Sequence, residues 1–356
     1  MKQDVSSVNI AVIGTGLIGQ RHARILQDTD ALSLFATVDP ATKPTITNKH
    51  IAASHFSSFD AFLDASDGCE GVVIATPNDT HFDIASRCME KGLACLIEKP
   101  LAANSQDALG ILKVSEQTKT QVLVGHHRRH HLVSQNLRDT IDKGALGQIV
   151  GAQLCWMLKK PDDYFAAGDW RTKSGGGPVW INLIHEIDLL RYFMGEIVEV
   201  SAMLSNAIRK TEAEDTGVLN MRFENGAIAS AILSDTAPSP WHFEGGSGEN
   251  PNIASTGQDA LRIFGTTGSI SFPSMTHWSH QDGNGHWGTD ILSSRGNLQT
   301  AMGGEVALTA QLKHFADVIQ KKAMPLVSAR DGLQSVRVVE AIHQSAKTGK
   351  AVSVST

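Results

Sequence analysis

The segment formed by residues 9–39 constrains the fold more than any other part of this chain of 356 residues. A β-branched apolar run at 10–13 leads directly into the pattern Gly-x-Gly-x-x-Gly at Gly14, Gly16 and Gly19, and the periodic segment 17–26 then predicts a helix. In this context the glycines allow a tight turn, a close approach of the backbone to a pyrophosphate, and close packing of the helix on the strand. The anion would bind at the helix N-terminus, where unpaired N–H groups and the helix dipole favour negative charge.

A carboxylate stands at the position that such a segment needs for ribose binding. A second strand is predicted at 32–38, and it ends at Asp39, twenty positions after Gly19. That spacing suits an acid that accepts hydrogen bonds from the ribose of the adenosine half. Asp39 would repel a 2′-phosphate at the same place, so we expect NAD as the cofactor. NADP stays possible, because Thr42 and Lys43 lie close by in the sequence.

The first third of the chain alternates strands and helices. Further buried strands are predicted at 71–77, 93–97 and 121–125, and helices at 79–91 and 104–119 separate them. Asn78 or Asp79 would cap the first of these helices, and Asn104 or Ser105 the second. Strict alternation implies a parallel, doubly wound α/β sheet, which is a Rossmann fold.

The strand at 93–97 is followed by Glu98, Lys99 and Pro100. Ligands of open α/β sheets bind outside the carboxyl ends of the strands, so these charges stand where a substrate would lie. Pro100 disfavours the α conformation for Lys99 and holds it on an extended segment. The alternative is a surface charge pair before a turn.

After about residue 126 the pattern changes to a helix at 132–143 and then mostly strands. These are predicted at 149–158, 198–205, 217–223, 228–234, 261–264 and 269–272. Asn225-Gly226 between two of them predicts a hairpin. The second half is therefore expected to be α+β with a large, mainly antiparallel, open-faced sheet. The stretches 236–259 and 274–298 are expected to be long loops near an active site or a subunit contact.

A second chemical cluster lies on a helix predicted from Pro178 to Gly195. His185 and Asp188 are three positions apart and share a face of it. An imidazole is well matched to proton transfer near neutral pH, and the acid could orient the ring. The alternative is a buried histidine that bonds to a local carboxylate for structural reasons.

Four histidines surround a pair of arginines after the strand at 121–125. On a helix, His126 with His130 and His127 with His131 would form i, i+4 pairs, a spacing known from zinc sites. The usual glutamate between such histidines is absent, and a third ligand would have to come from elsewhere. We therefore expect a polar rim, with Arg128 near the substrate or cofactor, and no metal.

Composition limits the class of protein. The net charge is −6 and no basic stripe is visible, so nucleic acid is not expected as a partner. No apolar run reaches the length of a membrane span, and the first residues lack the apolar core of a signal peptide. The four cysteines show no Cys-x-x-Cys pairing, which is typical of free thiols in a reducing compartment. We expect a cytoplasmic protein with no membrane partner.

Taken together, these motifs resemble the glucose–fructose oxidoreductase, inositol dehydrogenase and MocA family of NAD(P)-dependent dehydrogenases. The resemblance covers nearly the whole chain. Its markers are the glycine fingerprint at 14–19, Thr76-Pro77-Asn78 with His81, Glu98-Lys99-Pro100, Gly175-Gly176-Gly177, and His185-Glu186-Ile187-Asp188. Their order and spacing are specific for the family and not for one substrate.

The resemblance implies roles for matching positions. Lys99 would contact both the nicotinamide and the substrate hydroxyl, and His185 would be the acid–base catalyst. Many relatives carry an aspartate where this chain has Ile181, so Asn182 is expected to bind substrate instead. The residues expected at the substrate are Asn182, Asp188, Arg128 and Tyr164. Those expected at the cofactor are Gly14, Thr15, Gly16, Leu17, Ile18, Gly19, Asp39, Thr76, Pro77, Asn78, His81, Glu98, Lys99, Trp170 and Arg171.

We therefore expect a dehydrogenase that moves a hydride between NAD and a hydroxyl-bearing carbon of a sugar, cyclitol or related cyclic polyol. The alternative is a regulator on the same fold that binds NAD(P) or a sugar without turnover; the presence of both Lys99 and His185 favours the enzyme. Two domains are expected, 1–125 for the dinucleotide and 126–356 for substrate binding and oligomerisation. The resemblance implies a homodimer or homotetramer.

Overall fold

The computed structural model describes residues 7–41, 53–281, 285–295 and 306–355. The chain divides into two compact units, Met1–His127 with Ala307–Val336, and Arg128–Val306 with Arg337–Thr356. We predicted one boundary after residue 125. The structure divides the chain close to that point, but it also returns Ala307–Val336 to the first unit. A compositional change along the chain indicates where a unit ends and cannot show that a later segment returns to it.

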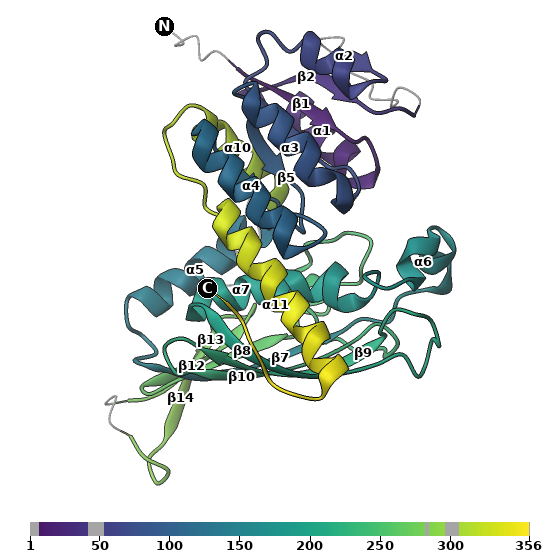
Figure 1. Cartoon of the computed structure of the whole chain (residues 1–356). Coiled ribbons are helices and arrows are strands. Elements are labelled where there is room, and N and C mark those ends of the chain that lie inside the picture. The colour runs from purple at the N-terminus through teal and green to yellow at the C-terminus, as the bar shows by residue number, and fades with distance from the viewer. Residues whose placement is uncertain (1–6, 42–52, 282–284, 296–305, 356) are drawn as a thin grey trace, which may run out of the picture. The chain divides into compact units, whose positions relative to one another are not determined.

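The first unit contains a parallel sheet with the strand order β3-β2-β1-β4-β5-β6. Figure 1 labels β1, β2 and β5 of this sheet. Its strands are β1 (Val8–Ile13), β2 (Leu32–Val38), β3 (Ser54–Phe56), β4 (Gly71–Ile74), β5 (Ala94–Ile97) and β6 (Val122–Val124). Its helices include α1 (Leu17–Asp28), α2 (Phe59–Asp64), α3 (His81–Glu90), α4 (Ser105–Thr118) and α10 (Ala307–Ile319). The strand order changes direction between β1 and β4, and this switch point is where such sheets bind ligands. The predicted doubly wound fold is confirmed.

Two helix starts in the first unit test the capping predictions. The Asn104 side chain accepts a hydrogen bond from the Asp107 N–H at 2.9 Å, so the predicted cap of α4 is confirmed. The cap predicted for α3 was wrong. A 3₁₀ turn, Asn78–Thr80, precedes this helix, and its N-cap residue Thr80 makes no side-chain capping bond. Two adjacent polar residues before a helix are compatible with several positions for its first residue. Here the 3₁₀ turn occupies residues 78–80, so α3 begins only at His81.

The second unit contains a larger sheet with the order β14-β13-β12-β11-β7-β10-β9-β8-β15. Its strands are β7 (Ile149–Met157), β8 (Ile197–Ser205), β9 (Thr216–Phe223), β10 (Ile228–Ser234), β11 (Leu261–Gly265), β12 (Gly268–Phe272), β13 (Thr276–His280), β14 (Ile291–Arg295) and β15 (Val352–Ser353). Among the described strands of this sheet, β7 and β10 are the one parallel pair, so the mainly antiparallel sheet is confirmed. The predicted hairpin joins β9 to β10, and its Gly226 has a φ of 88°.

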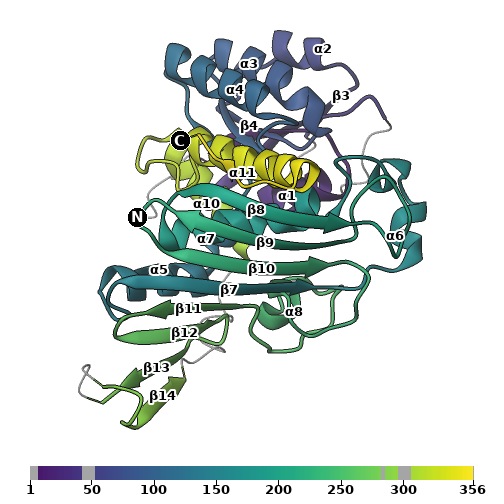
Figure 2. The same cartoon turned by 60° about the horizontal axis from the view of Figure 1, so that its bottom comes forward.

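One face of this sheet carries helices and the other is open (Figure 2). The helices include α5 (Leu132–Asp142), α6 (Asp162–Ala166), α7 (Ile184–Met194) and α8 (Phe243–Ser247), and α11 (Ala329–Thr348) begins in the first unit and ends in the second. Buried and exposed residues alternate along β9 and β10, as expected when one face packs on a core and the other meets solvent. The core includes Leu219, Phe223 and Leu233.

The two predicted loops contain regular structure where the structure describes them. The stretch 236–259 contains the short helix α8, and 274–298 contains β13 and β14, which pair antiparallel at one end of the sheet. The loop prediction for 274–298 was wrong because β14 is exposed along its whole length. A strand exposed on both faces has no alternation of apolar and polar residues, so its composition resembles that of a loop. Residues 282–284 and 296–298 lie outside the described part.

Candidate active site

The glycine turn after β1 leaves the N-terminus of α1 open. Gly14 has a φ of 87°, and a Cβ placed there would lie 2.6 Å from the carbonyl oxygen of Ala75. A Cβ at Gly19 would lie 1.9 Å from the carbonyl oxygen of Gly14, so the close packing expected of this glycine is present. Gly16 is the N-cap residue, and a Cβ there would meet nothing within 4 Å. The first turn of α1 therefore carries N–H groups with no side-chain cap beside open space, which is the arrangement that binds an anion.

Asp39 stands at the end of β2 and faces this turn. Its Oδ2 accepts a hydrogen bond from the Thr15 N–H at 2.6 Å, and its Oδ1 accepts one from the Ala41 N–H at 2.8 Å. Burial raises the pKa of Asp39, but these two backbone bonds outweigh it and the pKa is lower than usual. The carboxylate is thus ionised and fixed in orientation at the position predicted for ribose binding. Thr42 and Lys43 lie outside the described residues.

His81 joins the segments that follow β4 and β5. Its Nε2 lies 3.0 Å from the Thr76 carbonyl oxygen, and its Nδ1 lies 3.1 Å from that of Pro100. The side chain is fully buried, and burial lowers its pKa. We expected His81 at the cofactor, but a ring with no exposed surface holds the two segments instead. Thr76, Pro77 and Asn78 are accessible in the same turn.

The Glu-Lys-Pro motif follows β5 as predicted, but its two charged residues differ in environment. The Glu98 carboxylate is buried, with Oε1 2.7 Å from the His22 Nε2 of α1 and Oε2 accepting from the Lys99 N–H at 3.2 Å. Glu98 therefore binds protein groups rather than presenting a surface to a cofactor. Lys99 is half-buried at the carboxyl end of the sheet, and the peptide bond to Pro100 is cis.

The predicted helix in the second unit is made of two parts. Val179–Leu183 form a π-helical turn, and α7 continues from it to Gly195, whose φ of 97° ends it as predicted. Such turns occur frequently at functional sites. His185 lies buried in the first turn of α7. Asn182 precedes it, and the Asn182 Oδ1 is buried without a hydrogen-bond partner among the described residues.

Asp188, which shares a face of α7 with His185, forms buried ion pairs with two arginines. Both of its oxygens accept hydrogen bonds from Arg129, at 2.9 Å and 2.7 Å, and Arg191 lies 3.9 Å away. The carboxylate is 1% exposed, which leaves no surface for a substrate. Asp188 thus anchors Arg129 to α7. A spacing of three residues gives a shared helix face, but it cannot reveal a cation that arrives from 59 positions away.

Arg128 was expected near the substrate or cofactor, and the structure buries it among three carboxylates. Its guanidinium contacts Glu186 at 2.6 Å, Glu244 at 2.8 Å and Glu249 at 2.8 Å. It also lies over the Phe243 ring, 4.6 Å from the ring centre. At 2% exposure Arg128 is a structural centre that joins α7 to the stretch 236–259.

The carboxylates of this cluster differ in pKa. Burial raises the pKa of Glu186 to about 7, although Arg128 acts in the opposite direction. For Glu244, burial is outweighed by Arg128 and His242, and the pKa falls to about 2. The difference follows from their partners, because Glu244 also accepts from the Trp156 Nε1 at 3.1 Å and lies 3.4 Å from the His242 Nδ1. Of these two carboxyl groups, Glu186 is the one whose pKa lies near neutral pH.

Tyr164, Trp170 and Arg171 form a separate group in the second unit. The Arg171 guanidinium lies 4.1 Å from the centre of the Tyr164 ring, and it donates to the Tyr164 carbonyl oxygen. A second cation, the Lys160 side chain, also lies over the Tyr164 ring, with its Nζ 4.9 Å from the ring centre. Burial raises the pKa of Tyr164. Trp170 is 56% exposed and Arg171 is half-buried, so both retain surface for a ligand.

The histidines at 126–131 do not form the helical pairs considered above. His127–His130 make a 3₁₀ turn, so the i, i+4 spacing does not place two rings on one helical face. Within the described residues, no group of three or more His, Cys, Asp or Glu side chains is arranged to hold a metal ion.

Several residues around these sites escaped the sequence reasoning. His22 pairs with Glu98, Glu244 and Glu249 surround Arg128, and Lys160 lies over Tyr164. His22 had a usable signal, because it lies three residues after Gly19 on the face of α1 that packs on the sheet. No sequence signal indicated Glu244 and Glu249, because both lie in the stretch 236–259, whose composition resembles that of a loop.

An open helix N-terminus, an anchored carboxylate after β2 and a lysine after β5 define a dinucleotide-dependent oxidoreductase. Comparison with known proteins gives the family. Residues 8–126 match the oxidoreductase family with an NAD-binding Rossmann fold, and 138–354 match the C-terminal alpha/beta domain of that family. The chain belongs to the glucose–fructose oxidoreductase, inositol dehydrogenase and MocA family, as its motifs indicated, and its cofactor is NAD.

Two curated relatives match the chain along almost its whole length but at low identity. It is 24% identical to inositol 2-dehydrogenase of Rhizobium meliloti, with 98% of this chain and 99% of that protein covered. It is also 24% identical to scyllo-inositol 2-dehydrogenase (NAD(+)) of Bacillus subtilis, with 98% and 96% covered. An Agrobacterium radiobacter oxidoreductase, solved with NAD+, L-tartaric acid and magnesium, matches with a TM-score of 0.80 at 17% identity and covers 98% and 99%. The fold is shared, and these identities do not define a substrate.

No helix among the described residues combines the length and the apolar character that a membrane crossing requires.

Proposed function

We propose that this protein transfers a hydride between NAD and a hydroxyl-bearing carbon of a sugar, cyclitol or related cyclic polyol. The observation that carries the proposal lies in the first unit. Lys99 follows β5 at the carboxyl end of the same sheet whose β1 leads into the open N-terminus of α1. A cation is thus available at the edge of the sheet where ligands of this fold bind.

The cofactor, Lys99 and His185 would each supply a different part of the chemistry. Bound NAD supplies the hydride acceptor or donor. In the first unit, Lys99 would donate a hydrogen bond to the substrate hydroxyl and stabilise the negative charge that develops on its oxygen. In the second unit, His185 would take the proton of that hydroxyl as the substrate is oxidised.

The side chain of Asn182 favours the proposal that the substrate carries more than one hydroxyl group. Its Oδ1 is buried and has no donor among the described residues, and a buried acceptor without a partner is costly. A second hydroxyl of the substrate would satisfy it. Cyclitols, aldoses, anhydrosugars and cyclic dihydrodiols all carry hydroxyls on neighbouring carbons, so they form the class to test.

The test is a screen of these four compound classes with NAD and with NADP, read by the absorbance of the reduced cofactor. The expected result is turnover of at least one compound by the wild-type protein and loss of that turnover in Lys99→Met. A folded protein that binds NADH but turns over no member of the panel would count against the proposal. It would favour a regulator that binds the cofactor without chemistry.

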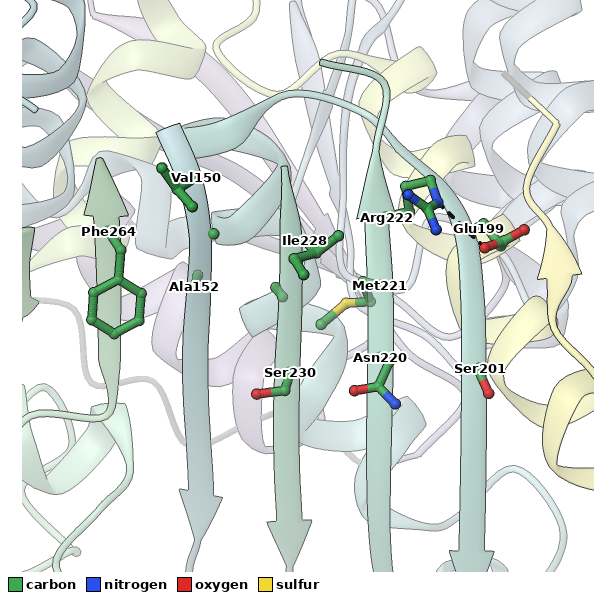
Figure 3. Close-up of a pocket in the computed structure, with 12 residues that line it drawn as sticks. Val150, Ala152, Glu199, Ser201, Asn220, Met221, Arg222, Ile228, Ser230 and Phe264 are labelled. Carbon is green, nitrogen blue, oxygen red and sulfur yellow. Dashed lines mark hydrogen bonds and ion pairs between the residues drawn. The ribbon is translucent and has the colours of Figure 1, made fainter. Parts of the chain in front are cut away.

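We also propose that the open face of the large sheet pairs with a second copy of the chain. Figure 3 shows Val150, Ile228 and Phe264 projecting from this face across β7, β10 and β11. They are 54%, 58% and 38% exposed and line a shallow groove of about 520 Å³. Contiguous exposed apolar patches on soluble proteins mark interaction sites, and a flat face suits the self-complementary contact of a two-fold dimer.

Sedimentation velocity over a range of protein concentrations tests the pairing. The wild-type chain is expected to sediment as a dimer or a larger even assembly, and Ile228→Glu should sediment as a monomer, because two copies of the new charge would meet at the contact. The control is Met324→Glu, at an exposed apolar position in the first unit, which should leave the assembly unchanged. A monomeric wild-type chain would contradict the proposal.

A further inference from the structure

We propose that His22 positions Lys99 through Glu98, and so links the helix that receives the dinucleotide to the lysine that receives the substrate hydroxyl. The inference rests on the proposed function in one respect, the role of Lys99. It adds a residue that no sequence motif had assigned to the chemistry. His22 would act without touching substrate or cofactor and is therefore a positioning residue.

The two oxygens of one buried carboxylate carry the connection. Glu98 Oε1 lies 2.7 Å from the Nε2 of His22, and Glu98 Oε2 accepts from the backbone N–H of Lys99 at 3.2 Å. His22 is fully buried and Glu98 is 8% exposed, so water does not compete for either bond. A rotation of the carboxylate that weakened one bond would therefore weaken the other.

Both ends of this connection are fixed to functional elements. His22 lies one helical turn after Gly19 on α1, whose open N-terminus is the anion site. Glu98 is held at the end of β5, where its N–H donates to the Ile74 carbonyl oxygen at 2.9 Å. On the β6 side a Cβ at Gly125 would lie 2.9 Å from the Glu98 Oε2, so only a glycine leaves room for the carboxylate.

The electrostatics of Glu98 suit a fixed anchor. Burial raises the pKa of Glu98, but the hydrogen bond and charge of His22, together with the charges of His127 and Lys99, outweigh it, and the pKa is lower than usual. The carboxylate therefore stays ionised at neutral pH. A buried ionisable pair rarely adds stability over a well-packed apolar pair, so placement of Lys99 is a better account of this pair than fold stability alone.

The His22 ring offers a matched pair of substitutions, because only one of its nitrogens makes the contact. Nε2 bonds to Glu98, whereas Nδ1 is buried without a hydrogen-bond partner in the described part of the chain. The side-chain nitrogen of glutamine reaches roughly the position of Nε2, and that of asparagine only the position of Nδ1. His22→Gln should keep the donor to Glu98, and His22→Asn should lose it.

The experiment compares kcat, the KM for substrate and the dissociation constant for NADH in both variants. We expect His22→Asn to lower kcat by roughly 10- to 100-fold, since small misplacements of a reacting group have effects of that order. NADH binding should change less than about threefold, because the turn and Asp39 hold the cofactor. His22→Gln should recover kcat to within about fivefold of the wild type. Equal kcat values in the wild type and His22→Asn would overturn the inference.

A second readout does not depend on activity. Competitive acetylation of the free protein, followed by peptide mass spectrometry, reports the reactivity of the Lys99 amine against that of exposed lysines. His22→Asn should change the relative reactivity of Lys99 at least about twofold, and His22→Gln should not, because the local positioning of the amine sets its access and charge environment. A purely structural role for His22 would leave the reactivity of Lys99 unchanged in every folded variant.

Glu98→Gln covers the case in which His22→Asn does not fold. The glutamine side chain has one acceptor oxygen, and its other end is an NH2 donor. It can therefore accept from only one of the His22 N–H and the Lys99 N–H, and at the other contact two donors face each other. It should lower kcat by a similar factor, and unchanged kcat would overturn the inference. Lys99→Met separates the two proposals. If the wild type turns over no compound, the proposed function fails; if Lys99→Met retains activity, the role of Lys99 fails and the positioning role with it. If Lys99→Met is inactive while both His22 variants are normal, only the positioning role fails.

Discussion

In the first unit the polar groups near the expected cofactor are held mainly by the backbone, whereas in the second unit the groups around His185 are held by buried ion pairs. Asp39 is fixed by the N–H groups of Thr15 and Ala41, and the anion site itself is made of N–H groups at the start of α1. In the second unit Asp188 is fixed by Arg129, and Glu186 by Arg128.

The difference has a physical consequence for mutation. A backbone hydrogen bond survives the replacement of most side chains, so the cofactor site should tolerate substitutions that leave its glycines alone. A buried charge depends on one partner side chain, and removal of that partner leaves the charge uncompensated. We therefore expect substitution of the backbone-held carboxylate in the first unit to change cofactor specificity, and substitutions of the buried pairs in the second unit to change stability together with its pH dependence.

The largest expected effect tests whether chemistry and cofactor binding are separable in this way. His185→Asn removes the proposed general base from the second unit and should lower kcat by about 10²–10⁴-fold. The dissociation constant for NADH, measured by fluorescence titration, should change little, because the glycine turn and Asp39 lie in the first unit. Lys99→Met should be comparably damaging. If His185→Asn had a near-normal kcat, His185 would not be the general base, and Lys99 or Tyr164 would be the better candidate for the proton transfer.

The next effect concerns stability in the second unit. Arg128→Met should lower the free energy of unfolding by roughly 3–5 kcal/mol, because it leaves three buried carboxylates without their shared cation. The matched control is Lys173→Met, which removes an exposed ion pair with Glu212 in the same unit and should have a much smaller effect. Denaturant unfolding measures both. Similar losses in the two variants would contradict the idea that buried pairs organise this unit.

The same contrast explains how much could be predicted from the sequence. The glycine turn, Asp39, the Asn104 cap and most of the longer strands are encoded by residues that are neighbours in the chain, and the structure contains them. The short strands β3 and β15 were not predicted, and β4 ends at Ile74 rather than at residue 77. Glu186 and Glu249 reach Arg128 from 58 and 121 positions away, and no local pattern reports such a contact. The β13–β14 hairpin escaped prediction for another reason, since β14 is exposed on both faces and carries no alternation.

A smaller effect is expected when the backbone-held carboxylate is removed. Asp39→Ala should raise the ratio of kcat/KM with NADP to that with NAD by about tenfold or more, which corresponds to ~1.4 kcal/mol. The carboxylate accepts hydrogen bonds from the ribose hydroxyls of NAD and repels the 2′-phosphate of NADP. Its removal should therefore weaken the use of NAD and improve the use of NADP, and both changes raise the ratio. Asp60→Ala, an exposed acid in the same unit, is the control and should leave the ratio unchanged. A wild-type preference for NADP would contradict the role of Asp39.

The smallest expected effect is a change in the pH dependence of stability. The groups that face Glu186 are Arg128 and, across it, Glu244, Glu249 and His242. Because burial raises the pKa of Glu186 to about 7, the folded state holds a proton there that the unfolded chain releases nearer pH 4.5. The stabilisation from this proton is complete below about pH 4.5 and is lost as the pH rises toward 7.

Glu186→Gln should remove that component, because a neutral amide neither gains nor loses a proton in this range. Between pH 5 and 7 the free energy of unfolding of the wild type should fall relative to that of the variant, by up to about 1.4 kcal/mol per pH unit for one proton. The difference between the two curves cancels the titration of histidines elsewhere in the chain. Glu212→Gln, at an exposed position of the same unit, should give a curve parallel to that of the wild type. Parallel curves for Glu186→Gln as well would mean that Arg128 holds all three carboxylates ionised, and that this cluster, like the backbone-held carboxylate of the first unit, is indifferent to pH near neutrality.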